Sequence, residues 1–239
     1  MSCEAGSTDS EYIDTMKNKS SEKLKVIITG ATGMVGEGVA HECLHHENVD
    51  QVLIINRKPS RMNHVKLKEI IHTDFFNISS IEHQLKGYNA CFFCLGVSSV
   101  GMSEADYTSV TYDLTMNVAR TLSRLNPDMT FCYISGAGTN EHGKLMWARV
   151  KGKTESDLTK LPFRRVYNFR PGIIEPTKGL KNTLKPYRYI GWLLPLIRLV
   201  LPNSICSLRE LGLAMIHSVE NGYGKQVLEV RDIKKLAEE

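Results

Sequence analysis

Thr29-Gly30-Ala31-Thr32-Gly33-Met34-Val35-Gly36 is the stretch of sequence that decides the fold. It follows a β-branched run, 24–29, and leads into an amphipathic helical pattern, 35–45. Glycines at this spacing allow a sharp turn with positive φ, a close approach of the backbone to a ligand, and tight packing of the first helical turn on the strand. The free amides at the start of the helix would then face an anion.

This strand, turn and helix together predict a site for the diphosphate of a dinucleotide. A glycine triplet alone is a weak signal, and here the flanking elements supply the context that makes it specific. We expect contacts to the dinucleotide from six turn residues: Gly30, Thr32, Gly33, Met34, Val35 and Gly36.

The rest of the chain alternates short β-branched or aromatic runs with helical patterns, which predicts parallel strands joined by helical crossovers. Strands are expected at 24–29, 51–56, 69–72, 90–95, 130–134, 165–169 and 226–230. Helices are expected at 35–45, 78–85, 103–125, 145–160 and 209–220, with Ser103 and Asp106 marking one helix start. The fold class is therefore α/β, a doubly wound parallel sheet of the Rossmann type.

The chain has 239 residues, which suits one large domain. Residues 1–22 are polar with little periodicity and are expected to be a disordered extension. The domain then spans 23–239 and includes a substrate-side insertion, 172–207. Its apolar part, 184–202, carries Tyr187, Tyr189 and Trp192 and suits an apolar or stacking ligand. This part is interpreted as a helix over a pocket or at a dimer contact, with a shallow membrane anchor as the alternative.

The chemistry after the second strand indicates which dinucleotide is bound. A carboxylate there would accept hydrogen bonds from the ribose hydroxyls, whereas this chain has Arg57 and Lys58, which suit a 2′-phosphate. NADP(H) is therefore predicted over NAD(H), which stays possible. Asp74 and Phe75 follow the third strand, where adenine would lie, and Leu95 and Gly96 end the fourth, where the cofactor would pass the backbone.

Composition excludes several other classes. The net charge of +4 is spread along the chain and forms no tract for nucleic acid. No apolar stretch approaches the roughly 20 residues needed to cross a bilayer. Six cysteines without a secretion signal make no disulfide framework and predict a cytoplasmic location. Cys91 and Cys94 are expected to pack on opposite faces of a strand, and no metal site is predicted.

Three further segments resemble the short-chain dehydrogenase/reductase superfamily, in its extended and atypical branches, as does the TGxxGxxG turn. They are Ile134 to Gly138, Trp147 to Glu155, and Phe169 to Ile174. The chain is similar to epimerase-like and Tat-interacting-protein-like reductases and, more distantly, to NmrA-like redox sensors. The resemblance implies that Pro171, Gly172 and Ile173 lie beside the nicotinamide. It also implies that helices such as 103–125 and 145–160 can pair two chains into a homodimer.

The family's chemistry uses a tyrosine and a lysine four residues apart on one helix face, with the lysine lowering the tyrosine pKa. Here Lys151 is in place, and the position four before it holds Trp147. An indole N–H donates a hydrogen bond but does not exchange a proton near neutral pH. Ser135 matches a family serine, although Gly136 follows where a second one is usual. Tyr112, Tyr133 and His142 are other candidates, none of them selected by spacing.

Two functions therefore stay open. One is an NADP(H)-dependent reductase or epimerase of atypical chemistry, acting on an apolar or carbonyl compound with Ser135 and Lys151 as catalytic residues. The other is a binding protein that reports the redox state of its dinucleotide to a partner, for which the missing tyrosine costs nothing. The sequence identifies neither the substrate nor the partner.

Overall fold

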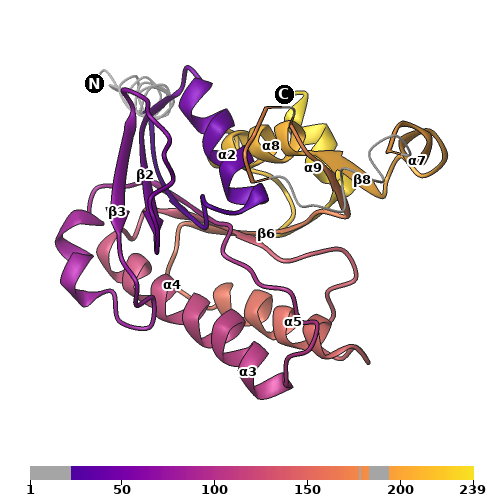
Figure 1. Ribbon diagram of the computed structural model, residues 1–239, viewed down its shortest axis with the longest axis horizontal. Helices are drawn as coiled ribbons and strands as arrows, with labels where there is room; N and C mark the ends of the chain where they lie inside the picture. Colours follow the sequence, from indigo (N-terminus) through magenta and orange to yellow (C-terminus); the bar gives the residue numbers. More distant parts are fainter. Residues whose placement is uncertain (1–22, 178, 183–193) are drawn as a thin grey trace, which may run out of the picture.

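The computed structural model describes residues 23–177, 179–182 and 194–239 (Figure 1). Seven strands form one all-parallel sheet in the order β3-β2-β1-β4-β5-β6-β9. They are β1 (Leu24–Thr29), β2 (Val49–Asn56), β3 (Leu67–Ile71), β4 (Ala90–Phe93), β5 (Thr130–Ile134), β6 (Arg165–Arg170) and β9 (Val227–Glu229). The order reverses between β1 and β4, which confirms the predicted doubly wound sheet and opens a crevice at the carboxyl ends of these strands.

Helices cover both faces of the sheet (Figure 1). One face carries α2 (Met34–His45), α8 (Leu208–Glu220) and α9 (Val230–Ala237), and the other carries α4 (Leu114–Leu125) and α5 (Met146–Leu158). Alternate residues of β1 serve the two cores: Val26 and Ile28 pack towards α2 and α8, and Ile27 packs towards α4. This alternation explains why the buried strands are apolar throughout.

The helix expected at 103–125 is interrupted. It comprises α3 (Glu104–Thr108), a π-helical turn η2 (Ser109–Asp113) and α4. The predicted helix start is confirmed, since the Ser103 hydroxyl accepts a hydrogen bond from the Asp106 amide at 3.1 Å. The helix expected at 78–85 is a 3₁₀ segment, η1 (Ser79–Gln84). Periodicity alone does not distinguish these variants of a helical turn.

Two short strands frame the segment expected to be an insertion. They are β7 (Ile173–Glu175) and β8 (Ile205–Ser207), which pair in parallel, with α7 (Leu194–Val200) between them. The guanidinium of Arg198 contacts Glu175 at 3.0 Å and also pairs with Glu210 at the start of α8. The sequence interpretation missed both strands because three residues carry too little pattern. Residues 1–22 and Tyr187, Tyr189 and Trp192 lie outside the described residues.

The cysteines behave as packing residues. Cys91 is buried in the core under α4, and Cys94 packs against the core under α2, so the two point to opposite sides of the sheet as predicted. All five cysteines in the described part of the chain are free. Of the helices in those same residues, none combines the length and the apolar character that crossing a bilayer requires.

Candidate functional site

The glycine turn brings three chain segments into close contact. Gly30 has φ of +74°, and a Cβ there would lie 2.8 Å from the carbonyl oxygen of Cys94. A Cβ on Gly36 would lie 2.2 Å from the carbonyl oxygen of Gly30. Side chains at these positions would therefore push β1 away from the end of β4, or α2 away from the turn. The turn keeps its shape only because both positions are glycine.

The start of α2 is left free for an anion. Gly33 is the N-cap residue and offers no side-chain hydrogen bond to the first amides. The Gly33 amide itself donates to the Gly30 carbonyl at 2.9 Å, which fixes the turn ahead of the helix. Since the first amides of a helix have no intrahelical acceptor and carry the positive end of its dipole, this end of α2 can hold a phosphate.

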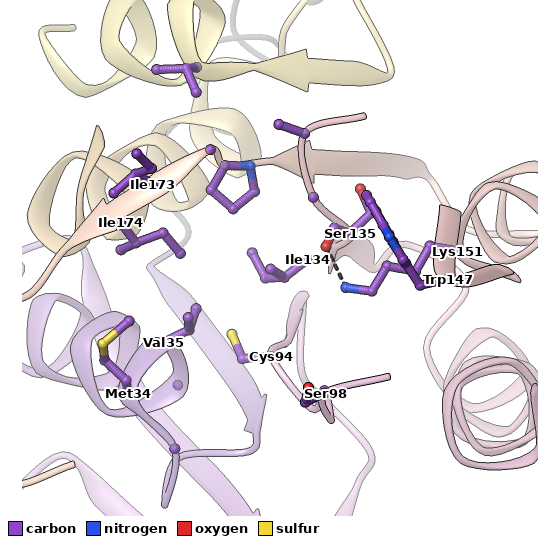
Figure 2. A pocket seen from close by; sticks show the side chains of 18 of the residues that line it. Met34, Val35, Cys94, Ser98, Ile134, Ser135, Trp147, Lys151, Ile173 and Ile174 are labelled. Atoms are coloured by element: carbon purple, nitrogen blue, oxygen red, sulfur yellow. Dashed lines mark hydrogen bonds between the residues drawn. The ribbon is translucent and has the colours of Figure 1, made fainter. Parts of the chain in front are cut away.

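A cavity of about 800 Å³ opens at this edge of the sheet (Figure 2). It is lined by many of the residues expected to bind or act on a ligand: Gly33, Met34, Val35, Gly36, Leu95, Gly96, Ser135, Trp147, Lys151, Pro171, Gly172 and Ile173. It is also lined by residues to which the sequence interpretation gave no contact with the ligand: Cys94, Val97, Ser98, Ile134, Gly136, Ala137, Ile174, Asn203, Ser204, Glu229 and Val230. Seven separate segments thus meet at the crevice where β1 and β4 diverge.

The other expected contact residues lie around this cavity rather than in its wall. Gly30 and Thr32 are in the turn, and Arg57 and Lys58 are exposed immediately after β2. Asp74 is exposed, and its carboxylate accepts a hydrogen bond from the Phe76 amide at 2.9 Å. The Phe75 ring is only 4% exposed and packs in the core under α4, away from the cavity, so in this structure it presents no face to a base.

Trp147 and Lys151 line the cavity from one face of α5, and both are half-buried (Figure 2). The Lys151 ammonium donates a hydrogen bond to the backbone carbonyl of Ser135. Burial lowers the pKa of Lys151 to about 8, and the nearby Glu155 carboxylate opposes that shift. Lys151 is thus a cation held at the cavity wall, with a proton that it gives up more readily than an ordinary lysine does.

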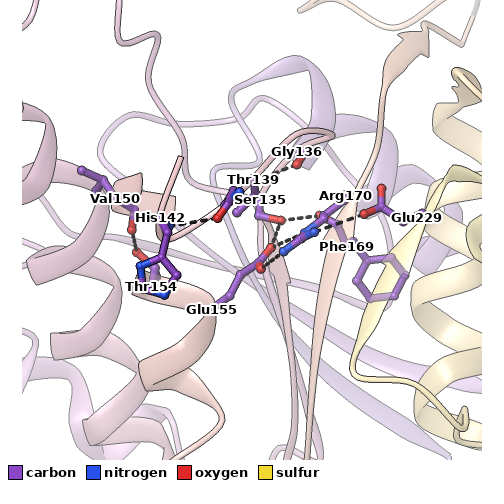
Figure 3. Close-up of polar contacts among 11 residues, drawn as sticks. Ser135, Gly136, Thr139, His142, Val150, Thr154, Glu155, Phe169, Arg170 and Glu229 are labelled. Carbon is purple, nitrogen blue, oxygen red and sulfur yellow. Dashed lines mark hydrogen bonds and ion pairs between the residues drawn. The ribbon is translucent and has the colours of Figure 1, made fainter. Parts of the chain in front are cut away.

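The Ser135 hydroxyl is occupied by a buried ionic network (Figure 3). It donates to the carboxylate of Glu155, which is 4% exposed, and lies 3.1 Å from the Phe169 carbonyl oxygen. Arg170 binds the same carboxylate through two contacts, Nε to Oε1 at 2.9 Å and Nη2 to Oε2 at 2.5 Å. The serine that the family resemblance assigns to catalysis therefore directs its hydroxyl at Glu155, a residue that the sequence interpretation quoted but gave no role.

Among the described residues that line the cavity, none is a tyrosine or a histidine. Tyr133 is buried in the core under α4, and burial raises its pKa well above the usual value. The hydroxyl of Tyr112 donates to Asp157 at 2.7 Å, and His142 is exposed. Within the described part of the chain, the three candidates considered for the missing phenol are thus all placed elsewhere.

Two relatives cover most of the chain at low identity. Protein FMP52-1, mitochondrial, from Scheffersomyces stipitis is 26% identical over 67% of this chain and 74% of its own length. Protein HTATIP2 from Rattus norvegicus is 26% identical over 66% of this chain and 64% of its own length. The chain thus spans somewhat less than two thirds of the second protein.

Among solved structures, Bordetella bronchiseptica WbmG in complex with NAD superposes with a TM-score of 0.65 at 11% identity, covering 90% of this chain and 77% of that one. At this identity the match shows the fold, which agrees with the sheet order above. The expectation of a cytoplasmic location is contradicted by the relatives, because FMP52-1 and several further FMP52 proteins are named mitochondrial.

The matching family is recognised over residues 26–167, more than half of the chain. That stretch runs from β1 into β6 and includes the glycine turn, Trp147 and Lys151. The chain belongs to the NAD dependent epimerase/dehydratase family.

Proposed function

We propose that this chain binds NADP(H) in the cavity at the start of α2 and acts as a sensor of the cofactor's redox state. The observation that carries the proposal is Trp147, which stands where the family's proton-transferring phenol would be. The engagement of the Ser135 hydroxyl by Glu155 supports it, because a donor held by a carboxylate is not free for a substrate oxygen. Binding of the cofactor needs neither a phenol at position 147 nor a free Ser135 hydroxyl.

The cofactor would be held by groups of complementary charge. The amides of Met34, Val35 and Gly36 would face the diphosphate, with Gly30, Thr32 and Gly33 shaping the turn. Arg57 and Lys58 would bind the 2′-phosphate, and Asp74, Leu95 and Gly96 would border the adenosine half. The Lys151 ammonium would bind the nicotinamide ribose, with Pro171, Gly172 and Ile173 beside the ring. NAD(H) would use the same contacts except those of the two cations.

Replacing Arg57 with alanine is expected to raise the Kd for NADPH about tenfold and to leave the Kd for NADH unchanged. A charge-assisted hydrogen bond to a phosphate is worth roughly 1.5–3 kcal/mol, part of which Lys58 would retain. Fluorescence titration of wild type and Arg57→Ala with both cofactors measures the difference. Lys86→Ala, which removes an exposed cation remote from the cavity, is the matched control. Equal affinity of the wild type for NADH and NADPH would contradict the preference.

A second candidate function is a slow reductase or epimerase acting on an apolar or carbonyl compound. The depressed pKa of Lys151, about 8, favours it, because an ammonium of that pKa can protonate an alkoxide near neutral pH. Ile173, Ile174 and Asn203 would then contact the substrate, since they already line the cavity. Partners in either case would be a small molecule or a protein, with a homodimer as a further possibility.

Restoring the phenol separates the two functions. Trp147→Tyr is expected to raise NADPH oxidation on a panel of carbonyl compounds about tenfold while the Kd for NADPH stays the same. A general acid can contribute roughly 10²–10⁴ in rate, and the engaged Ser135 hydroxyl limits the recovery here. Trp147→Phe, which has the ring without the hydroxyl, is the control. Wild-type turnover in the usual enzymatic range, above about 1 s⁻¹, would rule out the sensor.

A further inference from the structure

Three metal-ligating side chains meet at the far end of α2, away from the cavity. His46 follows α2, and His217 and Glu220 lie in the last turn of α8. One ligand atom from each residue lies within 4.8 Å of those from the other two, and all three side chains are half-buried. The two imidazole rings stand 5.8 Å apart at an interplanar angle of 66°. None of the three lines the cofactor cavity.

The packing of α2 against α8 brings these groups together (Figure 1). A Cβ on Gly38 would lie 2.8 Å from the side chain of Leu208, and one on Gly212 would lie 2.7 Å from that of Glu42. Four residues further along α2, Glu42 contacts Gly212, which is four residues further along α8 than Leu208. The two helices therefore run parallel, and their C-terminal ends lie side by side. The negative ends of two helix dipoles therefore converge on the cluster, which favours a cation there.

His217 is already oriented as a metal ligand. Its Nδ1 lies 2.6 Å from the carbonyl oxygen of Leu236 in α9. A carbonyl only accepts, so Nδ1 carries the proton and Nε2 keeps its lone pair free. Histidine ligands of metals are commonly fixed by such a second contact. His46 would give up one weak interaction, a 3.3 Å hydrogen bond from the Asn48 amide to its Nδ1.

We propose that His46, His217 and Glu220 bind a divalent transition metal of the zinc class, with water completing a tetrahedron. Two imidazoles and a carboxylate form a known donor set for Zn²⁺. Ligand atoms of a tetrahedral zinc lie about 3.3 Å apart, so small side-chain rotations would close the site. The bound ion would tie the end of the cofactor-binding helix to α8 and, through Leu236, to α9.

The proposal is tested with ZnCl₂ and CoCl₂ on the tag-free full chain. Calorimetry is expected to show one zinc bound per chain, and bound zinc should raise the Tm, because a ligand of the native state stabilises it. Cobalt should give the visible absorption bands of a tetrahedral ion with nitrogen and oxygen ligands. His46→Gln, His217→Gln and Glu220→Gln should each weaken zinc binding roughly 100-fold, at least as much as loss of an outer-shell contact does.

His45→Gln is the matched control. The ring of His45 lies 4.4 Å from that of His41 and 5.7 Å from that of His64, so His45 belongs to a separate histidine group. The His45→Gln substitution should leave the zinc affinity and the cobalt spectrum unchanged. Circular dichroism of each metal-free variant shows whether its fold is kept. Glu220→Gln, a nearly isosteric change in the last residue of α8, serves if His217→Gln does not fold. Wild-type affinity in all three ligand variants, or its loss only in His45→Gln, would overturn the proposal.

Discussion

Replacing Gly36 with alanine is expected to weaken NADPH binding roughly 100-fold and to lower the free energy of unfolding by about 3 kcal/mol. The added Cβ would lie 2.2 Å from the Gly30 carbonyl oxygen, which is backbone and has no rotamer to move into. Relief requires α2 to shift away from the turn, and its free amides shift with it. Loss of one or two charge-assisted contacts to the diphosphate weakens binding roughly 100-fold.

Gly33→Ala is the control for the effect of an added methyl group on stability in the same turn. Its Cβ would meet the Gly30 carbonyl oxygen at 3.4 Å, an ordinary contact, and its φ of −102° suits any residue. Denaturant unfolding should therefore show a change within about 1 kcal/mol for this variant. If Gly36→Ala unfolds at the wild-type denaturant concentration and binds NADPH normally, the turn does not have the role assigned to it here.

Replacing Glu155 with glutamine is expected to lower the free energy of unfolding by about 3 kcal/mol. Removing one partner of a buried ion pair leaves an uncompensated charge, at a cost of roughly 3–5 kcal/mol. The lower figure applies because the Arg170 side chain is 20% exposed and keeps a contact to Glu229 at 3.2 Å. A guanidinium keeps its proton at any ordinary pH, so Arg170 stays charged in the variant and cannot avoid the cost by losing its proton.

Glu229→Gln provides the comparison, because Glu229 contacts the same guanidinium from a side chain that is 50% exposed. Exposed pairs contribute about 0–1 kcal/mol, so this variant should unfold near the wild-type midpoint. Urea unfolding followed by circular dichroism measures both variants. Equal effects of the two substitutions would show that burial does not distinguish these carboxylates.

The fold was predictable because its signals are local and repeated. Two strands, 24–29 and 130–134, were predicted with their observed bounds, and the glycine turn was placed correctly between β1 and α2. Strands β7 and β8 were missed since each is three residues long and is stabilised by pairing with the other. The helix α9 was missed because a strand of three residues runs directly into it.

The site was predictable only where position along the chain fixes position in space. Trp147 and Lys151 share a helix face, and the structure places both in the cavity. The partner of the Ser135 hydroxyl was not predictable, because Glu155 reaches it from another element and only the three-dimensional packing of α5 on β5 and β6 joins them. The cluster of His46, His217 and Glu220 joins residues much farther apart in sequence and gave no local pattern.

The place of β9 has a consequence for synthesis of the chain. The backbone groups along the outer edge of β6 are hydrogen-bonded by residues of and next to β9. One such bond runs from the Asn168 amide to the Gln226 carbonyl oxygen at 2.7 Å. Until residues 226–229 leave the ribosome, a nascent chain that has folded this far presents that edge unpaired. Open edges recruit other strands, so premature termination upstream of this point yields a product prone to aggregation.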